Sequence, residues 1–320
     1  MEKYKKVYKD YVAAFICLIV LNFMLPRLLP GDPVTTLIGD QVLFEMTDEM
    51  YKKLVVDFGL DQPLYIQFFK YIKGLIQFDF GYSYFYKKKV IDLIFSYIPW
   101  TILLVMTSMF FSLLIGYLTG IESGYHHGKR LDKYLLSVMI FISGFPQFFL
   151  GMLFLIFFSV QLGWFPLGGC ETACSDFTGI HRIQDILMHL ILPVITIVIA
   201  EVSNMYLLTR NTSIIVRKKY YMRTAIAKGL GEHVMKHRYL GKNSFIPLLT
   251  MAAIIMGRMF VGALLIEVVF SYPGLGSLIY EAIQVRDYPV LQGTFFMVAT
   301  MVLIFNGIAE GIHLKYSERR

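Results

Sequence analysis

Six long apolar runs constrain the fold of this chain more than any other feature. About 17 to 25 mostly apolar residues are enough to cross the hydrocarbon core of a bilayer as an α-helix. The composition agrees, because only 17% of the 320 residues are charged, against about 25% in soluble proteins. We therefore predict an all-α membrane protein with six transmembrane helices, over residues 10–29, 98–121, 134–161, 186–209, 245–270 and 289–314.

Lysine and arginine are distributed unevenly among the segments between these runs. They are frequent before the first run, between the second and third, and between the fourth and fifth, whereas only Arg182 and Arg286 follow the third and fifth runs. Since basic residues favour the cytoplasmic side, both termini are expected there. Lys87, Lys88 and Lys89 fall on the outer side, but long segments translocate largely regardless of charge. The net charge of +7 thus indicates orientation in a membrane and not nucleic-acid binding.

The runs divide the chain into an N-terminal tail with the first helix (1–29), an external segment (30–97), a core of five helices (98–314) and a cytoplasmic tail (315–320). The core includes a cytoplasmic loop over 210–244. Helical spacing in the external segment predicts helices over 47–60 and 63–76. Its aromatic residues lie either in the membrane interface or in a small external cap, the simpler interpretation; they include Tyr65, Phe68, Phe69 and Tyr71.

Catalytic and cofactor motifs are absent from the sequence. The stretch "LGKN" (240–243) lacks the upstream glycine and the hydroxyl residue of a P-loop, so no ATP site is expected in this chain. His233 and His237 are four residues apart but lack the zinc-protease signature. Cys170 and Cys174 form either a loop disulfide or two free thiols, and they have no second ligand pair for zinc. We expect no enzyme activity, no bound cofactor and no metal site.

One polar, basic stretch interrupts the apolar core at residues 223–248. Four apolar residues fall at helical spacing, namely Met222, Ala225, Ile226 and Leu230. Gly229 and Gly231 are expected to end this short helix, because glycine readily adopts positive φ. Small residues there (Ala225, Ala227 and Gly229) permit close approach of a soluble partner. The alternative is a basic loop held by anionic lipid headgroups.

The stretch "RTAIAKGLGEHVMKHRYLGKNSFIPLLT" (223–250) closely resembles the cytoplasmic loop of type-1 permease subunits of ABC importers, in the branch that handles oligopeptides, dipeptides and nickel. The long external segment after the first helix is similar to that of the first permease type in such systems. Further resemblances follow in the family's order over almost the whole chain: "LPRLLPGDP" (25–33), "GLDQPLYIQF" (59–68), "LGWFP" (162–166), "HLILPVITI" (189–197), "LLTR" (207–210), "EVVFSYPGLG" (267–276) and "RDYPVLQG" (286–293).

The resemblance implies a coupling helix that sits in a cleft of an ATPase subunit. Arg223, Thr224 and Ala225 occupy the place of the family's more general Glu-Ala-Ala triplet, and Gly229 is its glycine. The implied partners are a second homologous permease subunit, two ABC ATPase subunits that use ATP, and an extracellular solute-binding protein. The implied location is the cytoplasmic membrane of a bacterium or archaeon. Peptides are the implied cargo, with nickel or a metal–chelator complex as the alternative.

Polar residues also occur inside the predicted spans. Glu201 and Arg258 either line a translocation path with Glu267 or form a structural ion pair with each other, because ionisable groups at membrane depth face a cavity or a partner. Pro273, Gly274 and Gly276 are expected to form a turn that shapes the outer mouth, or a gate, or a contact with the binding protein. An ion-coupled secondary transporter is less consistent with the sequence, which shows no clear inverted repeat.

Overall fold

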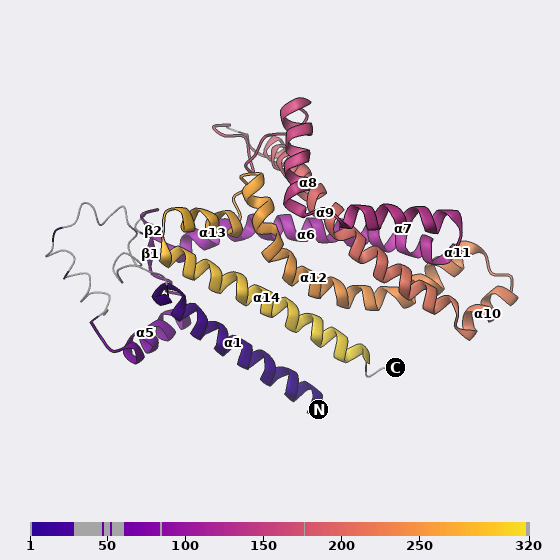
Figure 1. Ribbon diagram of the computed structural model, residues 1–320, viewed down its shortest axis with the longest axis horizontal. Helices are drawn as coiled ribbons and strands as arrows, with labels where there is room; N and C mark the ends of the chain where they lie inside the picture. The colour runs from indigo at the N-terminus through magenta and orange to yellow at the C-terminus, as the bar shows by residue number, and fades with distance from the viewer. Residues whose placement is uncertain are drawn as a thin grey trace. The chain divides into compact units, whose positions relative to one another are not determined.

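The computed structural model describes residues 2–28, 47, 52, 61–83, 85–175 and 177–317. It divides into two compact units, Met1–Thr101 with Pro273–Ile304 and Ile102–Tyr272 with Phe305–Arg320, which are described separately. The predicted helical class is confirmed, since helices make up nearly all the regular structure of the described residues (Figure 1).

Five helices are long and apolar enough to cross a membrane, and a bent pair gives a sixth if it counts as one span. Five of the predicted runs therefore each correspond to a single helix. Every one of these helices begins before the predicted start, and three also extend beyond the predicted end, because polar residues continue the helix outside the apolar stretch. These helices are α1 (Glu2–Leu28), α6 (Val90–Tyr125), α9 (Ile180–Arg217), α12 (Lys242–Val269) and α14 (Tyr288–Ser317).

The prediction of one continuous helix over 134–161 is wrong. The chain forms α7 (Arg130–Ser143), α8 (Gln147–Phe154) and the π-helix η1 (Leu155–Gln161), with a 92° bend after α7. Pro146 explains the break: it has no N–H for a continuing helix and disfavours helical dihedrals at the residue before it, but it starts a new helix well.

The first unit holds the external elements. Helix α5 (Leu64–Ile76) begins after Pro63, which confirms the predicted helix over 63–76, whereas the predicted helix over 47–60 lies almost entirely outside the described residues. A short hairpin of β1 (Tyr82–Ser83) and β2 (Lys88–Lys89) leads directly into α6. The hairpin is tied to the region around α13 (Leu275–Gln284): Ser83 Oγ donates to Asp287 Oδ2 at 2.5 Å, and Tyr86 OH donates to Glu281 Oε2 at 2.6 Å.

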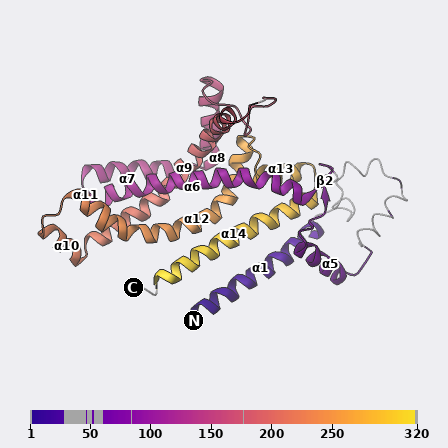
Figure 2. The same cartoon turned by 180° about the vertical axis from the view of Figure 1, so that it is seen from behind.

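The second unit packs α7, α8 and α12 against α9, and both ribbon views show α7, α9 and α12 side by side (Figures 1 and 2). The predicted cytoplasmic loop over 210–244 is mostly helical. It contains the end of α9, then α10 (Tyr220–Ala227), α11 (Glu232–Val234) and the π-helix η2 (Met235–Gly241), which runs directly into α12.

Candidate functional site

Helix α10 is the element that the sequence singled out as a docking surface. Lys219 precedes it with extended dihedrals, and Gly229 follows it at φ +69°. The N–H of Gly229 donates to Ile226 O at 2.9 Å and that of Leu230 donates to Ala225 O at 3.3 Å, so the glycine ends the helix in the left-handed conformation that glycine alone adopts without strain. Gly231, in contrast, has φ −63°, so the expectation of a second positive-φ glycine is wrong.

The two faces of α10 differ from the predicted stripe. Met222 and Ala225 are buried, and Met222 packs in a cluster with Ile121, Val216 and Leu240. Ile226, predicted to share this buried stripe, is 56% exposed. The physical reason is the length of the helix, which is only two turns, so that one residue per turn suffices to anchor it.

The outward face is what α10 can offer to another protein. Tyr220 is 85% exposed, and Arg223, Thr224, Ala227 and Gly229 are also exposed. Ala225, at 2% exposed, packs inside the unit and is not part of this surface. The structure thus brings four of the five predicted coupling residues to the surface, with an aromatic ring beside them.

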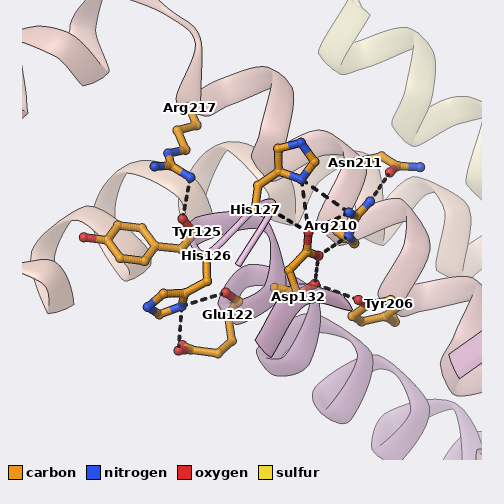
Figure 3. A network of polar contacts seen from close by, with 11 residues as sticks. Glu122, Tyr125, His126, His127, Asp132, Tyr206, Arg210, Asn211 and Arg217 are labelled. Carbon is orange, nitrogen blue, oxygen red and sulfur yellow. Dashed lines mark hydrogen bonds and ion pairs between the residues drawn. The ribbon is translucent and has the colours of Figure 1, made fainter. Parts of the chain in front are cut away.

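A buried carboxylate forms a network of polar contacts where α6, α7 and α9 meet (Figure 3). Asp132, near the start of α7, accepts hydrogen bonds from Arg210 Nε at 2.6 Å and Nη2 at 2.9 Å on α9. It also accepts from Ser123 Oγ at 2.5 Å on α6 and from the Gly128 N–H at 2.9 Å. Ser123 in turn lies 2.6 Å from Tyr206 OH. One side chain thus ties three helices together at the end of the unit that carries α10.

A second polar cluster joins α6 to α11 and η2. Lys236 Nζ lies 2.6 Å from Glu122 Oε2 and 2.5 Å from Glu232 Oε1, and His126 contacts both carboxylates. Glu122, His126 and Glu232 are the one group within the described residues whose ligand atoms come within 4.8 Å of one another as a metal site requires. The ammonium of Lys236 already occupies the position of a cation between the carboxylates, so these residues are better explained as an ion-pair network.

Glycines allow α6 and α9 to approach very closely. Gly116, Gly120 and Gly124 repeat every fourth residue, on one face of α6. A Cβ atom on these glycines would come closer to α9 than real Cβ atoms do: 2.4 Å from Met205 Cβ, 2.6 Å from Thr209 Cβ and 2.5 Å from Ser213 Cβ, respectively. The spacing of these three glycines is visible in the sequence, but the sequence analysis did not predict a close helix contact from it. Asp132 and Glu122 were also missed, because their partners are distant in sequence.

The polar residues at membrane depth do not pair as one hypothesis required. Glu201, buried on α9, accepts hydrogen bonds from Gln147 Nε2 and from Asn204 Nδ2, both at 3.0 Å. Arg258 is exposed on α12 and makes no ion pair within the described part of the chain. Glu267 is fully buried near the end of the same helix. Glu201 and Arg258 therefore do not form an ion pair within the described residues, and two amides satisfy the carboxylate instead.

The turn after α12 differs in detail from the expected one. Gly274 precedes α13 with extended dihedrals, and Gly276 lies inside that helix, so neither glycine takes the positive φ of a tight turn. Ser271 takes it instead, at φ +47°. Pro273 lies between them and is half-buried. Leu275 N–H donates to Thr101 Oγ1 at 2.8 Å, which fixes the start of α13.

Cys170 and Cys174 are free thiols in the structure. Burial, with the Glu171 carboxylate as a further cause, raises the pKa of Cys170 to about 11. The thiolate is the species that attacks a disulfide or binds a metal, so a protonated thiol reacts slowly at neutral pH.

Comparison with known proteins assigns this chain to a protein family. A family model described as "Binding-protein-dependent transport system inner membrane component" matches residues 112–320. The glutathione transport system permease protein GsiC of Escherichia coli (strain K12) is 35% identical over 298 residues, which cover 92% of this chain and 90% of that protein. The di/tripeptide transport system permease protein DppB of Pseudomonas aeruginosa (strain UCBPP-PA14) is 32% identical over 318 residues, covering 93% and 92%. These matches confirm the resemblance read from the sequence, and the chain belongs to the family of inner-membrane components of binding-protein-dependent transport systems.

Proposed function

We propose that this chain is one of two membrane-spanning subunits of an ATP-driven importer of short peptides, and that α10 transmits the movement of an ATPase subunit to it. The observation that carries the proposal is the surface of α10, whose exposed face lies opposite a buried side fixed by Met222 and Ala225. Membership of the family supports a binding protein as a partner, since the family's description names one. It supports an ATPase subunit as the second partner because such transport systems are driven by ATP.

Peptides are the proposed cargo. The names of the two relatives specify glutathione and di- or tripeptides, all of which are short peptides. The remaining partners are proposed by the same family argument: a second homologous permease subunit, two ABC ATPase subunits and an extracellular solute-binding protein. The ATPase subunits would bind and hydrolyse ATP. We propose that this chain itself binds no cofactor.

The coupling role is tested by variants of the exposed face. Arg223→Glu and Ala227→Trp are expected to abolish co-purification of a tagged ATPase subunit and uptake of a labelled tripeptide, because they change charge and shape where the partner would sit. Lys133→Glu makes the same charge change on an exposed residue of α7 and should leave both intact. If the ATPase subunit co-purifies with both α10 variants as fully as with the wild type, the proposal is contradicted. Ala225 is not a suitable test position, because a bulky residue there would disturb the interior.

We further propose that the exposed face of α12 either lines the translocation path or contacts the second permease subunit. Arg258 lies among exposed apolar residues of that face, such as Ile254 and Val261. A charge facing hydrocarbon is costly, so this face requires a polar environment. Glu201 and Glu267 remain candidates for the path on the same ground. Arg258→Ala decides: stability retained with uptake lost supports the path or contact, whereas a destabilised protein with normal uptake contradicts it.

A further inference from the structure

An exposed apolar stripe runs along α5. Tyr65, Phe69 and Ile76 are 63%, 67% and 75% exposed, and half-buried Ile72 lies between them. Their spacing places all four on one face of the helix. With 13 residues, α5 is roughly 20 Å long and too short to cross the hydrocarbon core. The stripe is therefore not explained by a membrane crossing.

Contacts with α1 fix the depth of α5. The apolar window of α1 is Val7–Met24, and α5 contacts α1 only near the end of that window in the described interactions. The contacts are a Phe68 ring 5.1 Å from the Phe23 ring, Asn22 Nδ2 donating to Tyr71 OH at 2.9 Å, and Arg27 Nη2 donating to Gln67 Oε1 at 2.6 Å. Helix α5 thus lies beside one end of a membrane span, at the boundary of the hydrocarbon core.

Exposed cations lie beside the stripe at this boundary. Lys70 and Lys73 lie on the side of α5 turned away from both the stripe and the residues that contact α1, and Arg27 is exposed at the end of the span. Three sectors thus follow one another around α5: a face packed on α1, an apolar face and a basic face. Apolar and aromatic residues beside lysines are typical of helices that lie in the plane of a membrane interface.

We propose that α5 is an interfacial helix that binds phospholipid, with Tyr65, Phe69 and Ile76 at the acyl boundary and Lys70 and Lys73 at the phosphate headgroups. The distribution of Lys and Arg predicts this leaflet to be the outer one. The helix then anchors the external segment to the bilayer beside α1. The proposal depends on the chain lying in a membrane and not on coupling to an ATPase.

Spin-label accessibility in liposomes tests this directly, on the full chain with its three cysteines, Cys17, Cys170 and Cys174, replaced by serine. A nitroxide at Phe69→Cys is expected to collide more with oxygen, which concentrates in lipid, than with a water-soluble nickel chelate. A nitroxide at the matched control Lys70→Cys, the next residue on the same helix, should show the opposite order. A label at Phe68→Cys should be shielded from both reagents, which verifies that α5 is folded against α1.

Two outcomes would overturn the proposal. Greater access of the chelate to the Phe69 label would place the stripe in water. Shielding of that label from both reagents would mean that protein covers it, either another part of this chain or a neighbouring subunit. Repeating the measurement with the solute-binding protein present separates lipid from that partner, since an interfacial helix keeps its oxygen access.

Discussion

Asp132→Asn removes one charge from the buried cluster that joins α6, α7 and α9 and keeps the shape of the side chain. The carboxylate of Asp132 is 3% exposed and the guanidinium of Arg210 is 11% exposed, with their closest atoms 2.6 Å apart. At an effective dielectric constant of about 20, unit charges roughly 3 Å apart attract by about 5–6 kcal/mol, from which the desolvation of both groups must be subtracted. Removing one partner leaves Arg210 buried without its counter-charge, so we expect a loss of about 3–5 kcal/mol in the free energy of unfolding.

The assay is reversible unfolding in mixed micelles of wild type, both single variants and the double variant. Arg210→Met should cost about as much as Asp132→Asn, and the double variant should cost less than the sum of the two, because neither charge is then left alone. Glu171→Gln is the matched control, since it removes a carboxylate from an exposed ion pair with Arg182 and should cost less than about 1 kcal/mol. If Asp132→Asn costs no more than this control, or the two single costs simply add, the cluster does not hold the helices together.

Two further predictions concern packing and pH. Gly120→Ala should lower the free energy of unfolding by about 1–3 kcal/mol, because its Cβ would lie 2.6 Å from Thr209 Cβ; thermal unfolding in detergent checks this, and Gly311→Ala, whose Cβ meets nothing within 4 Å, should not be destabilising. Burial raises the pKa of Asp287, so the stability that its protonated form contributes is fully present below the ordinary value of 3.8 and is lost as pH rises through the folded-state pKa. The free energy of unfolding of the wild type should fall as pH rises between about 4 and 7, and Asp287→Asn should lose this dependence, although its side chain still accepts the hydrogen bond from Ser83. An unchanged pH profile in Asp287→Asn would contradict the raised pKa of Asp287.

The number of spans and their approximate positions follow from hydropathy, because a run of apolar residues has few stable alternatives to a helix in a bilayer. The break after Ser143 does not follow from hydropathy, since apolar residues lie directly on both sides of it. Pro146 was the available signal. The two π-helices, η1 and η2, carry no comparable mark in the sequence.

The coupling surface was predicted as a segment and not as a face. Helical spacing identified Met222 and Ala225 correctly as one side of α10, but it also placed Ile226 there, and the small size of Ala225 was taken as a sign of contact with a partner. A small side chain permits close packing on either side of a helix. The burial of Ala225, at 2% exposed, shows that it belongs to the side that packs inward with Met222, which contacts Leu240.

Long-range polar contacts determine how a force on α10 would spread. Asp132 joins α6, α7 and α9. Next to that junction, Gly116, Gly120 and Gly124 hold the backbone of α6 against α9 over about two turns. Elements packed this closely shift as rigid bodies and do not deform continuously. If an ATPase subunit pushes on α10, the proposed motion therefore cannot stop at that helix, because α6, α7 and α9 would have to move together.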